Sequence, residues 1–221
     1  MSMVLVGVSG SQTEFPPMND AALIIFTRNP ELGKCKTRLA ATIGDSNALE
    51  VYKYLIGHTV GITKELPFDC FVYYSEKIHT GDTWEDSIYQ KAVQVSGDLG
   101  VKMKSAFQDL FTKGYKRVAI IGSDLFDLQS DDLIAGLQAL SSNEVVLGPA
   151  QDGGYYFLGI TEMIPQLFTN KEWGTDTVLA DTLSNLKDKS VALLPVRNDI
   201  DYFEDLKDRP EFEPFIPEHL K

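Results

Sequence analysis

The chain has 221 residues, of which 43% are hydrophobic and 24% are charged, a composition that can bury the core of a single domain. Its formal net charge is -12, from 32 acidic and 20 basic residues, which argues against a surface that neutralises nucleic acid or anionic lipid. We therefore expect no nucleic-acid partner. An anionic ligand would need a local cluster of cations or a bound metal ion.

Cysteine content and apolar runs bear on the location of the protein. Cys35 and Cys70 are too few for a disulfide framework or a four-ligand zinc site, which favours the cytoplasm. No apolar run approaches the roughly 20 residues of a membrane span, and residues 1–27 contain no Lys or Arg for a signal peptide. We interpret residues 1–19 as a loosely held extension and residues 20–221 as one domain.

Short runs rich in β-forming residues alternate with helical patterns along the chain, which is typical of an α/β fold with a mainly parallel central sheet. The runs are 22–27, 68–75, 91–96, 117–122, 144–149, 155–160 and 191–196. Amphipathic patterns at 46–66 and 99–111 predict crossover helices that face the sheet, with Leu99 in the apolar stripe of the second. Further helices are expected with Ser130 as the N-cap and after Gly174. Ligands of such sheets bind beyond the carboxyl ends of the strands, so polar residues there are candidates.

Four cations follow the first of these strands. Arg28, Lys34, Lys36 and Arg38 lie within 11 residues of an otherwise acidic chain, in a loop that leads into a helix. Such a loop can surround phosphates with cations and free backbone N–H groups. The loop has neither the Walker pattern nor the Rossmann glycine pattern. A merely solvated cationic loop is the alternative.

Two carboxylates three residues apart, Asp124 and Asp127, follow the strand at 117–122. Mg²⁺ and Mn²⁺ take oxygen ligands, commonly one or two protein carboxylates together with substrate phosphates. Both aspartates are therefore candidate metal ligands. The alternative for Asp127 is that it caps the next helix.

A tight turn is expected where Asp152, Gly153 and Gly154 follow the strand at 144–149. The paired glycines allow unusual backbone angles or the close approach of a ligand, although a plain hairpin explains them equally well. Asp152, like Asp124, lies within three residues of the end of its predicted strand.

Two further segments carry candidate residues. Trp173, Thr175 and Asp176 precede a helix, where capping is the alternative explanation, and Asp199 and Asp201 follow the last strand, where a solvated turn is the alternative. Asp124, Asp152 and Asp199 each follow a predicted strand. Three carboxylates crowded at one edge of the sheet would repel one another by several kcal/mol unless a cation lay among them. The pattern therefore predicts a bound divalent metal.

Six motifs in order, from about Ala21 to Leu206, resemble the DUF2064 family of predicted glycosyltransferases. They are KTRLA, GDLG-x-K-M, IGSD-x-x-DL, VVLGPA-x-DGGYY-x-LG, W-G-T-D-x-VL and D-I-D-x-x-EDL. Leu125-Phe126 and Tyr202-Phe203 depart from the Cys-Pro and Thr-Pro pairs usual in that family, which puts the geometry of these two loops in doubt.

The resemblance implies a Rossmann-like GT-A sandwich that binds a nucleotide diphosphate-sugar and is related to guanylyltransferases. It implies that Lys34, Lys36 and Arg38 lie near the diphosphate. It also implies that Asp124 binds the metal, with Asp199 or Asp201 as the second metal contact.

The leading hypothesis is a metal-dependent glycosyltransferase that moves a sugar from a nucleotide diphosphate-sugar to an unknown small-molecule acceptor. Mg²⁺ or Mn²⁺ would neutralise the departing diphosphate, and Asp152 or Asp176 would act as general base. Gly153, Gly154, Trp173 and Thr175 are the expected substrate contacts beside the four cations. The alternatives are a guanylyltransferase-like nucleotidyltransferase acting on a small phosphorylated substrate, and a nucleotide or sugar-nucleotide sensor without catalysis.

Overall fold

The computed structural model describes residues 4–5 and 18–221. Most of the predicted extension at 1–19 therefore lies outside the described residues. Of the described part of that segment, Val4–Leu5 form a short strand and Met18 is buried against the core. Within the described ranges, no helix combines the length and the apolar character needed to cross a membrane.

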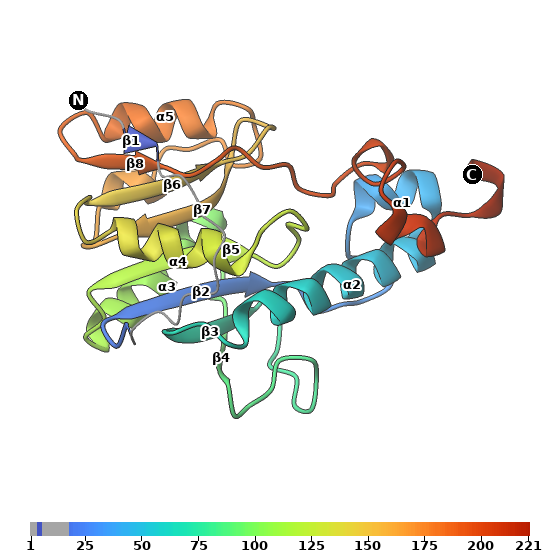
Figure 1. Cartoon of the computed structure of the whole chain (residues 1–221), viewed down its shortest axis with the longest axis horizontal. Helices are drawn as coiled ribbons and strands as arrows, with labels where there is room; N and C mark the ends of the chain where they lie inside the picture. The colour runs from blue at the N-terminus through green and yellow to red at the C-terminus, as the bar shows by residue number, and fades with distance from the viewer. Residues whose placement is uncertain (1–3, 6–17) are drawn as a thin grey trace.

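The elements form one eight-stranded sheet with helices on both faces, as the α/β pattern predicts (Figure 1). The strands are β1 (Val4–Leu5), β2 (Ala21–Thr27), β3 (Asp69–Tyr74), β4 (Tyr89–Val93), β5 (Arg117–Gly122), β6 (Val145–Pro149), β7 (Tyr155–Ile160) and β8 (Val191–Leu193). The α-helices are α1 (Thr37–Ile43), α2 (Asp45–Thr63), α3 (Leu99–Thr112), α4 (Ser130–Ala139) and α5 (Val178–Asn185). Short 3₁₀ helices are η1 (Pro165–Phe168), η2 (Phe203–Asp205), η3 (Pro210–Phe215) and η4 (Glu218–Leu220).

The strand order is β1-β8-β6-β7-β5-β2-β3-β4, and every pairing is parallel except those of β7. β7 runs antiparallel to β5 and β6 because only a tight turn, residues 150–154, separates it from β6. The carboxyl ends of β2, β5, β6 and β8 consequently meet at one edge of the sheet. The segments that carry most of the predicted site residues follow these four strands and therefore lie at this edge.

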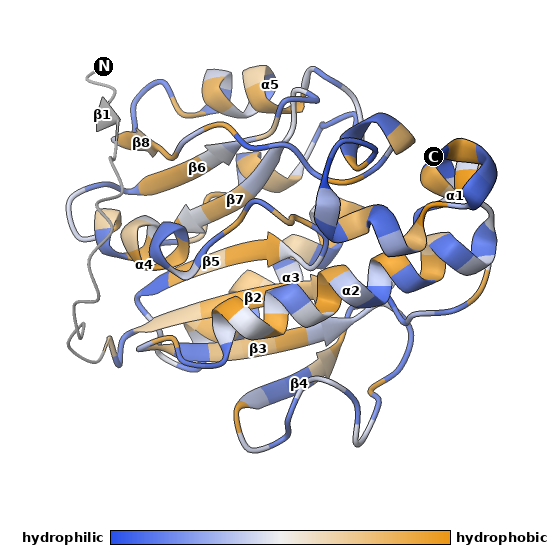
Figure 2. Cartoon of the chain, turned by 45° about the vertical axis from the view of Figure 1, so that its right-hand side comes forward, coloured by the Kyte–Doolittle hydropathy of each residue, from blue (hydrophilic) through white to orange (hydrophobic). Residues whose placement is uncertain are grey.

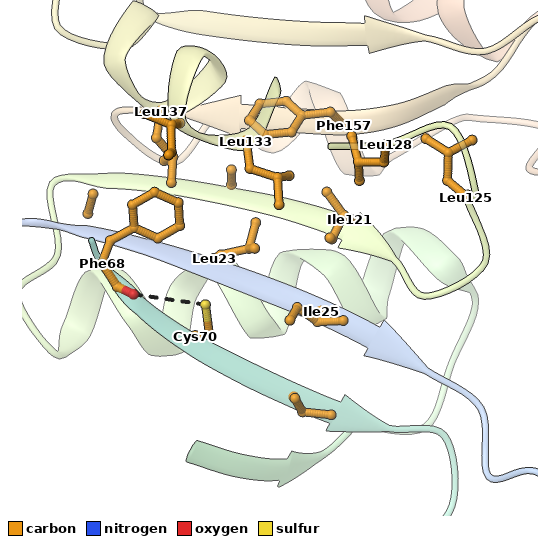
Figure 3. Packing of buried hydrophobic residues seen from close by; sticks show 14 of the residues in the cluster. Leu23, Ile25, Phe68, Cys70, Ile121, Leu125, Leu128, Leu133, Leu137 and Phe157 are labelled. Carbon is orange, nitrogen blue, oxygen red and sulfur yellow. Dashed lines mark hydrogen bonds between the residues drawn. The ribbon is translucent and has the colours of Figure 1, made fainter. Parts of the chain in front are cut away.

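Two hydrophobic clusters pack on opposite faces of the sheet. One face packs against α2 and α4, through side chains such as Ile56 and Leu137. Figure 3 shows Leu137 of α4 together with Leu23 and Phe157 of the sheet in this cluster. The other packs against α3 and α5. Figure 2 shows the central strands as largely hydrophobic, whereas the helices alternate between hydrophobic and polar residues. This alternation follows from one helix face being turned to the sheet and the other to solvent.

A third cluster lies beyond the sheet and joins α1 and α2 to the C-terminal segment, through residues that include Leu39, Leu55, Leu206 and Phe212. Figure 1 shows α1 and the C-terminus lying together beside the first turns of α2. This cluster fixes the cationic loop before α1 against the segment that follows β8.

Three local predictions differ from the structure. The strand predicted at 91–96 begins earlier, at Tyr89, whose ring is buried, and ends at Val93. The strand predicted to reach residue 196 ends at Leu193, two residues before Pro195, which has no N–H to donate to a neighbouring strand. Gln129, not Ser130, is the N-cap of α4, where it forms a capping box with Asp132.

Candidate functional site

A cavity of about 240 Å³ opens at the carboxyl edge of the sheet. It lies where β5 and β6 end and β7 begins, and the start of α3 and the segment before α5 complete its wall. Its lining residues are Leu99, Ile121, Gly122, Asp124, Leu125, Leu128, Ala150, Asp152, Gly154, Tyr155, Tyr156, Trp173, Gly174, Thr175, Val178 and Asp199. The structure thus brings together three aspartates, Asp124, Asp152 and Asp199, that each follow a different strand.

Ser123, the residue before Asp124, is held by a hydrogen-bond network at the ends of β2 and β5. The hydroxyl of Tyr52 on α2 lies 3.1 Å from Ser123 Oγ, which donates to Thr27 Oγ1 at 3.0 Å. A Cβ on Gly122 would lie 2.7 Å from Asp124 Oδ1, so the glycine leaves room for the carboxylate. The turn therefore presents Asp124 to the cavity from a buried, hydrogen-bonded base.

Lys36 joins two of the predicted metal ligands. Its Nζ donates to Asp124 Oδ2 and to Asp201 Oδ1, both at 2.9 Å, and only 4% of its side chain is exposed. Arg38 reaches the other carboxylate oxygen of Asp201 at 3.2 Å, and its guanidinium lies over the ring of Tyr202. Two of the four predicted phosphate-binding cations therefore contact the acidic segment after β8.

Neighbouring charges and burial shift the pKa values of Asp124 and Asp199 in opposite directions. Burial, with the negative charges of Asp201 and Asp124, raises the pKa of Asp199 to about 6. Burial also acts to raise the pKa of Asp124, but the charge and hydrogen bond of Lys36, with a smaller effect from Arg28, outweigh it and lower that pKa. Asp124 is accordingly ionised at neutral pH, whereas Asp199 titrates close to it.

The described side chains do not form a divalent metal site as they stand. Within residues 18–221, no three His, Cys, Asp or Glu side chains are grouped so that they could hold a metal ion. Between Asp124 and Asp201, the position that an ion would take is filled by Lys36 Nζ. Metal binding by Asp124, Asp199 and Asp201 remains a prediction.

The turn between β6 and β7 lies directly against the segment before α5. Gly153 has φ +86°, and a Cβ there would lie 2.2 Å from the carbonyl oxygen of Asp176. Leu179 N donates to the Gly153 carbonyl at 2.9 Å, and Gly154 N donates to Asp152 Oδ1 at the same distance. Both general-base candidates are thus held by one turn, but Asp152 lines the cavity and Asp176 does not.

Trp173 and Thr175 also line the cavity, and their predicted contact with substrate remains a prediction. A Cβ on Gly100, in the first turn of α3, would lie 3.0 Å from the Trp173 ring and 2.2 Å from the Phe168 carbonyl oxygen. The glycine thus allows the indole to pack against α3. Thr175 Oγ1 donates to the Glu172 carbonyl, which closes the loop before α5.

Two candidate residues lie away from the cavity. Lys34 is exposed and pairs with Glu31 at 2.8 Å and with Glu76 at 3.5 Å. Asp127 accepts two hydrogen bonds from the guanidinium of Arg209, at 2.5 and 2.9 Å, and does not cap α4. Asp127 therefore fastens the C-terminal segment to the turn after β5.

Sequence reasoning missed several lining residues because they have the character of core residues. The apolar pattern predicts that Leu99 faces the sheet, but Leu99 is 42% exposed and lines the cavity. For Tyr155 and Tyr156 the pattern predicts only a place in a strand. The pairing of Lys36 with Asp201 spans 165 residues and leaves no local signal in the sequence.

Comparisons with known proteins agree with the fold. Residues 62–175 match the family described as "Uncharacterized protein conserved in bacteria (DUF2064)". None of the curated proteins matches the chain.

One solved structure is that of a Desulfovibrio desulfuricans G20 protein, which is assigned by inference as a nucleotide-diphospho-sugar transferase. Its sequence is 30% identical to this chain. It has a TM-score of 0.77, and the match covers 84% of each chain. Two more distant structures share the fold alone. They are 4-diphosphocytidyl-2C-methyl-D-erythritol synthase of Anaerococcus prevotii DSM 20548 (10% identity, TM-score 0.55, covering 85% of this chain and 92% of that one) and the manganese complex of Rv0371C of Mycobacterium tuberculosis H37Rv (12% identity, TM-score 0.54, covering 86% and 98%).

The family match extends over more than half of the chain, from the end of α2 to the loop before α5, and so includes the turns that carry Asp124 and Asp152. On this match, and on the 30% identity over most of both chains, the protein belongs to the DUF2064 family.

Proposed function

We propose that this protein transfers a sugar from a nucleotide diphosphate-sugar to a hydroxyl group of a small acceptor that carries no phosphate or carboxylate. The Desulfovibrio protein assigned as a nucleotide-diphospho-sugar transferase supports the donor class, at 30% identity. The cavity at the carboxyl edge of the sheet supports the location, because ligands of such sheets bind there.

The charge of the cavity wall is the observation that carries the proposal. Asp124, Asp152 and Asp199 line the cavity, and none of the described residues that line it is Lys, Arg or His. A phosphorylated acceptor would meet like charges, an arrangement that costs several kcal/mol. This favours glycosyl transfer to a neutral hydroxyl over nucleotidyl transfer to a phosphorylated substrate.

The cations lie beside the cavity rather than in it. Lys36 and Arg38 meet at Asp201, next to Asp124, and the charge of Arg28 also acts on Asp124. We assign these three residues to the diphosphate of the donor, where they would neutralise the charge that develops as it leaves. Of the four cations, Lys34 is the least suited to bind the diphosphate, because it pairs with two glutamates at the surface.

Asp152 is the general base in this proposal. The acceptor oxygen forms a bond to the anomeric carbon, the bond from that carbon to the diphosphate oxygen breaks, and the acceptor proton passes to the carboxylate. Asp152 lines the cavity, and the hydrogen bond from Gly154 N to its Oδ1 orients it. A base of this kind contributes about 10²–10⁴-fold to the rate.

Incubation with donors and with nucleoside triphosphates distinguishes the two reactions. We expect slow release of a nucleoside diphosphate from one of the UDP-, GDP-, ADP- or TDP-sugars, with water as acceptor, and faster release when a neutral polyol or sugar is added. Pyrophosphate release from a triphosphate and a phosphorylated acceptor would instead establish nucleotidyl transfer.

The variant Asp152→Asn tests the assignment of the base. It should lower turnover about 10²–10⁴-fold and leave donor binding within about twofold, because the amide cannot accept the proton. Asp188→Asn is the matched control, since Asp188 is exposed and has no ion pair in the described part of the chain. Full turnover by Asp152→Asn would remove Asp152 from the mechanism.

A further inference from the structure

The ammonium of Lys36 occupies the point at which the two acidic segments converge. It lies 2.9 Å from an oxygen of Asp124, after β5, and 2.9 Å from an oxygen of Asp201, after β8. The carboxylates are 40% and 30% exposed, but the lysine side chain is only 4% exposed. In the protein without a bound nucleotide, this buried ammonium is the counter-cation of both carboxylates.

The backbone holds Lys36 in this position. Lys36 has φ 48° and ψ 47°, in the left-handed region, immediately before α1 begins at Thr37. A residue with a Cβ is disfavoured in this conformation, so surrounding contacts must compensate. Leu39 and Ile43 supply them, because both are buried in the cluster that joins α1 to the C-terminal segment.

The position between the two carboxylates is already filled, because Lys36 Nζ lies within hydrogen-bond distance of an oxygen of each. A magnesium ion would need carboxylate oxygens at about 2.0–2.1 Å in near-octahedral geometry. The same two oxygens cannot surround such an ion while both accept hydrogen bonds from an ammonium that lies between them.

We propose that Lys36 and a divalent cation compete for the carboxylates of Asp124 and Asp201, and that in the ligand-free protein the lysine excludes the metal. Removal of the ammonium should therefore create a divalent-cation site at this edge. The inference concerns the protein without nucleotide, so it stands or falls separately from the proposed glycosyl transfer.

Titration with Mn²⁺ in the absence of nucleotide, followed by the electron paramagnetic resonance signal of free Mn²⁺, tests the proposal. Lys36→Met keeps an unbranched side chain as far as Cε and removes the ammonium group with its charge. We expect this variant to bind Mn²⁺ at least tenfold more tightly than the natural protein. The gain should disappear in the double variant Lys36→Met/Asp124→Asn.

Lys34→Met is the matched control, because it removes the same charge two residues earlier, from an exposed lysine that pairs with Glu31 and Glu76. It should leave Mn²⁺ affinity within about twofold. An increase equal to that of Lys36→Met would show a general effect of net charge and overturn the proposal.

A second measurement needs no Lys36 variant and serves if Lys36→Met does not fold, which circular dichroism will reveal. Asp124→Asn alone should leave the Mn²⁺ affinity of the nucleotide-free protein unchanged, because the lysine already excludes the ion. If the natural protein binds Mn²⁺ without nucleotide and Asp124→Asn abolishes that binding, Lys36 does not exclude the metal and the proposal is wrong.

Discussion

At the scale of single residues, the nearest cation determines what each carboxylate does. Asp127 pairs with Arg209 through both carboxylate oxygens, and both side chains are about two-thirds buried. Asp127→Asn should therefore lower the free energy of unfolding by about 1–2 kcal/mol, which urea denaturation at pH 7 measures. Mn²⁺ and nucleotide binding should be unaffected. Asp188→Asn, at an exposed position, should change stability by less than about 0.5 kcal/mol.

The pairing also predicts a dependence on pH. The hydrogen bond and charge of Arg209 lower the pKa of Asp127 below its ordinary value of 3.8. The stabilisation is therefore complete above that ordinary value and is lost as the pH falls through the lower pKa of the folded state. The stability difference between the natural protein and Asp127→Asn should shrink below pH 4. A difference that is constant from pH 7 to pH 3 would contradict the pairing.

The sequence locates carboxylates better than it locates their partners. Asp124, Asp152 and Asp199 were predicted to converge because each follows a strand, and all three line one cavity. Strand ends are visible in local patterns, so this prediction needed no long-range information. Arg209 lies 82 residues from Asp127, and only the packing of the C-terminal segment brings the two together.

At the scale of elements, the turn between β6 and β7 and the segment before α5 depend on each other through Gly153. Gly153→Ala would introduce a Cβ 2.2 Å from the Asp176 carbonyl oxygen at a positive φ, so backbone must move. We expect a loss of about 2–4 kcal/mol in the free energy of unfolding, with weaker donor binding because Asp152 and Trp173 shift.

Gly154→Ala is the control for this prediction. Its Cβ would lie 3.1 Å from Asp152 Oδ1, a side-chain atom that can rotate, and the loss should stay below about 1 kcal/mol. Equal losses in the two variants, measured by urea denaturation, would mean that the contact with Asp176 does not control the turn. The sequence indicated a tight turn but not the segment packed against it, since that segment lies more than 20 residues further along the chain.

At the scale of the whole molecule, the fold was readable from periodicity, but the spatial relation of α1 to the C-terminal segment was not. Alternating strands and amphipathic helices predict the layered sheet, whereas α1 and the 3₁₀ helices are too short to give a clear period. Yet the third hydrophobic cluster, which packs these short elements against α2, brings Lys36 to Asp201. The least predictable part of the fold therefore determines the charge balance of the site.

This arrangement predicts that metal and nucleotide bind cooperatively. A diphosphate offers Lys36 and Arg38 an alternative anion, and withdrawal of Lys36 from Asp124 and Asp201 would expose both carboxylates to a divalent ion. In thermal unfolding with ADP, GDP, TDP or UDP, we expect Mn²⁺ alone to change the melting temperature little. Mn²⁺ with the preferred diphosphate should raise it by more than the sum of the separate shifts. A ligand at 100 times its dissociation constant adds about 2.7 kcal/mol to the free energy of unfolding, a change that thermal unfolding detects readily.

The same cooperativity should be smaller in Lys36→Met, in which Mn²⁺ alone should already stabilise the protein because no ammonium competes for the carboxylates. Equal stabilisation of the natural protein and of Lys36→Met by Mn²⁺ alone would contradict the coupling. Failure of all four diphosphates to shift the melting temperature would instead count against the proposed donor class. The two ideas can therefore fail separately: the lysine is tested by the metal, and the glycosyl donor is tested by the nucleotide.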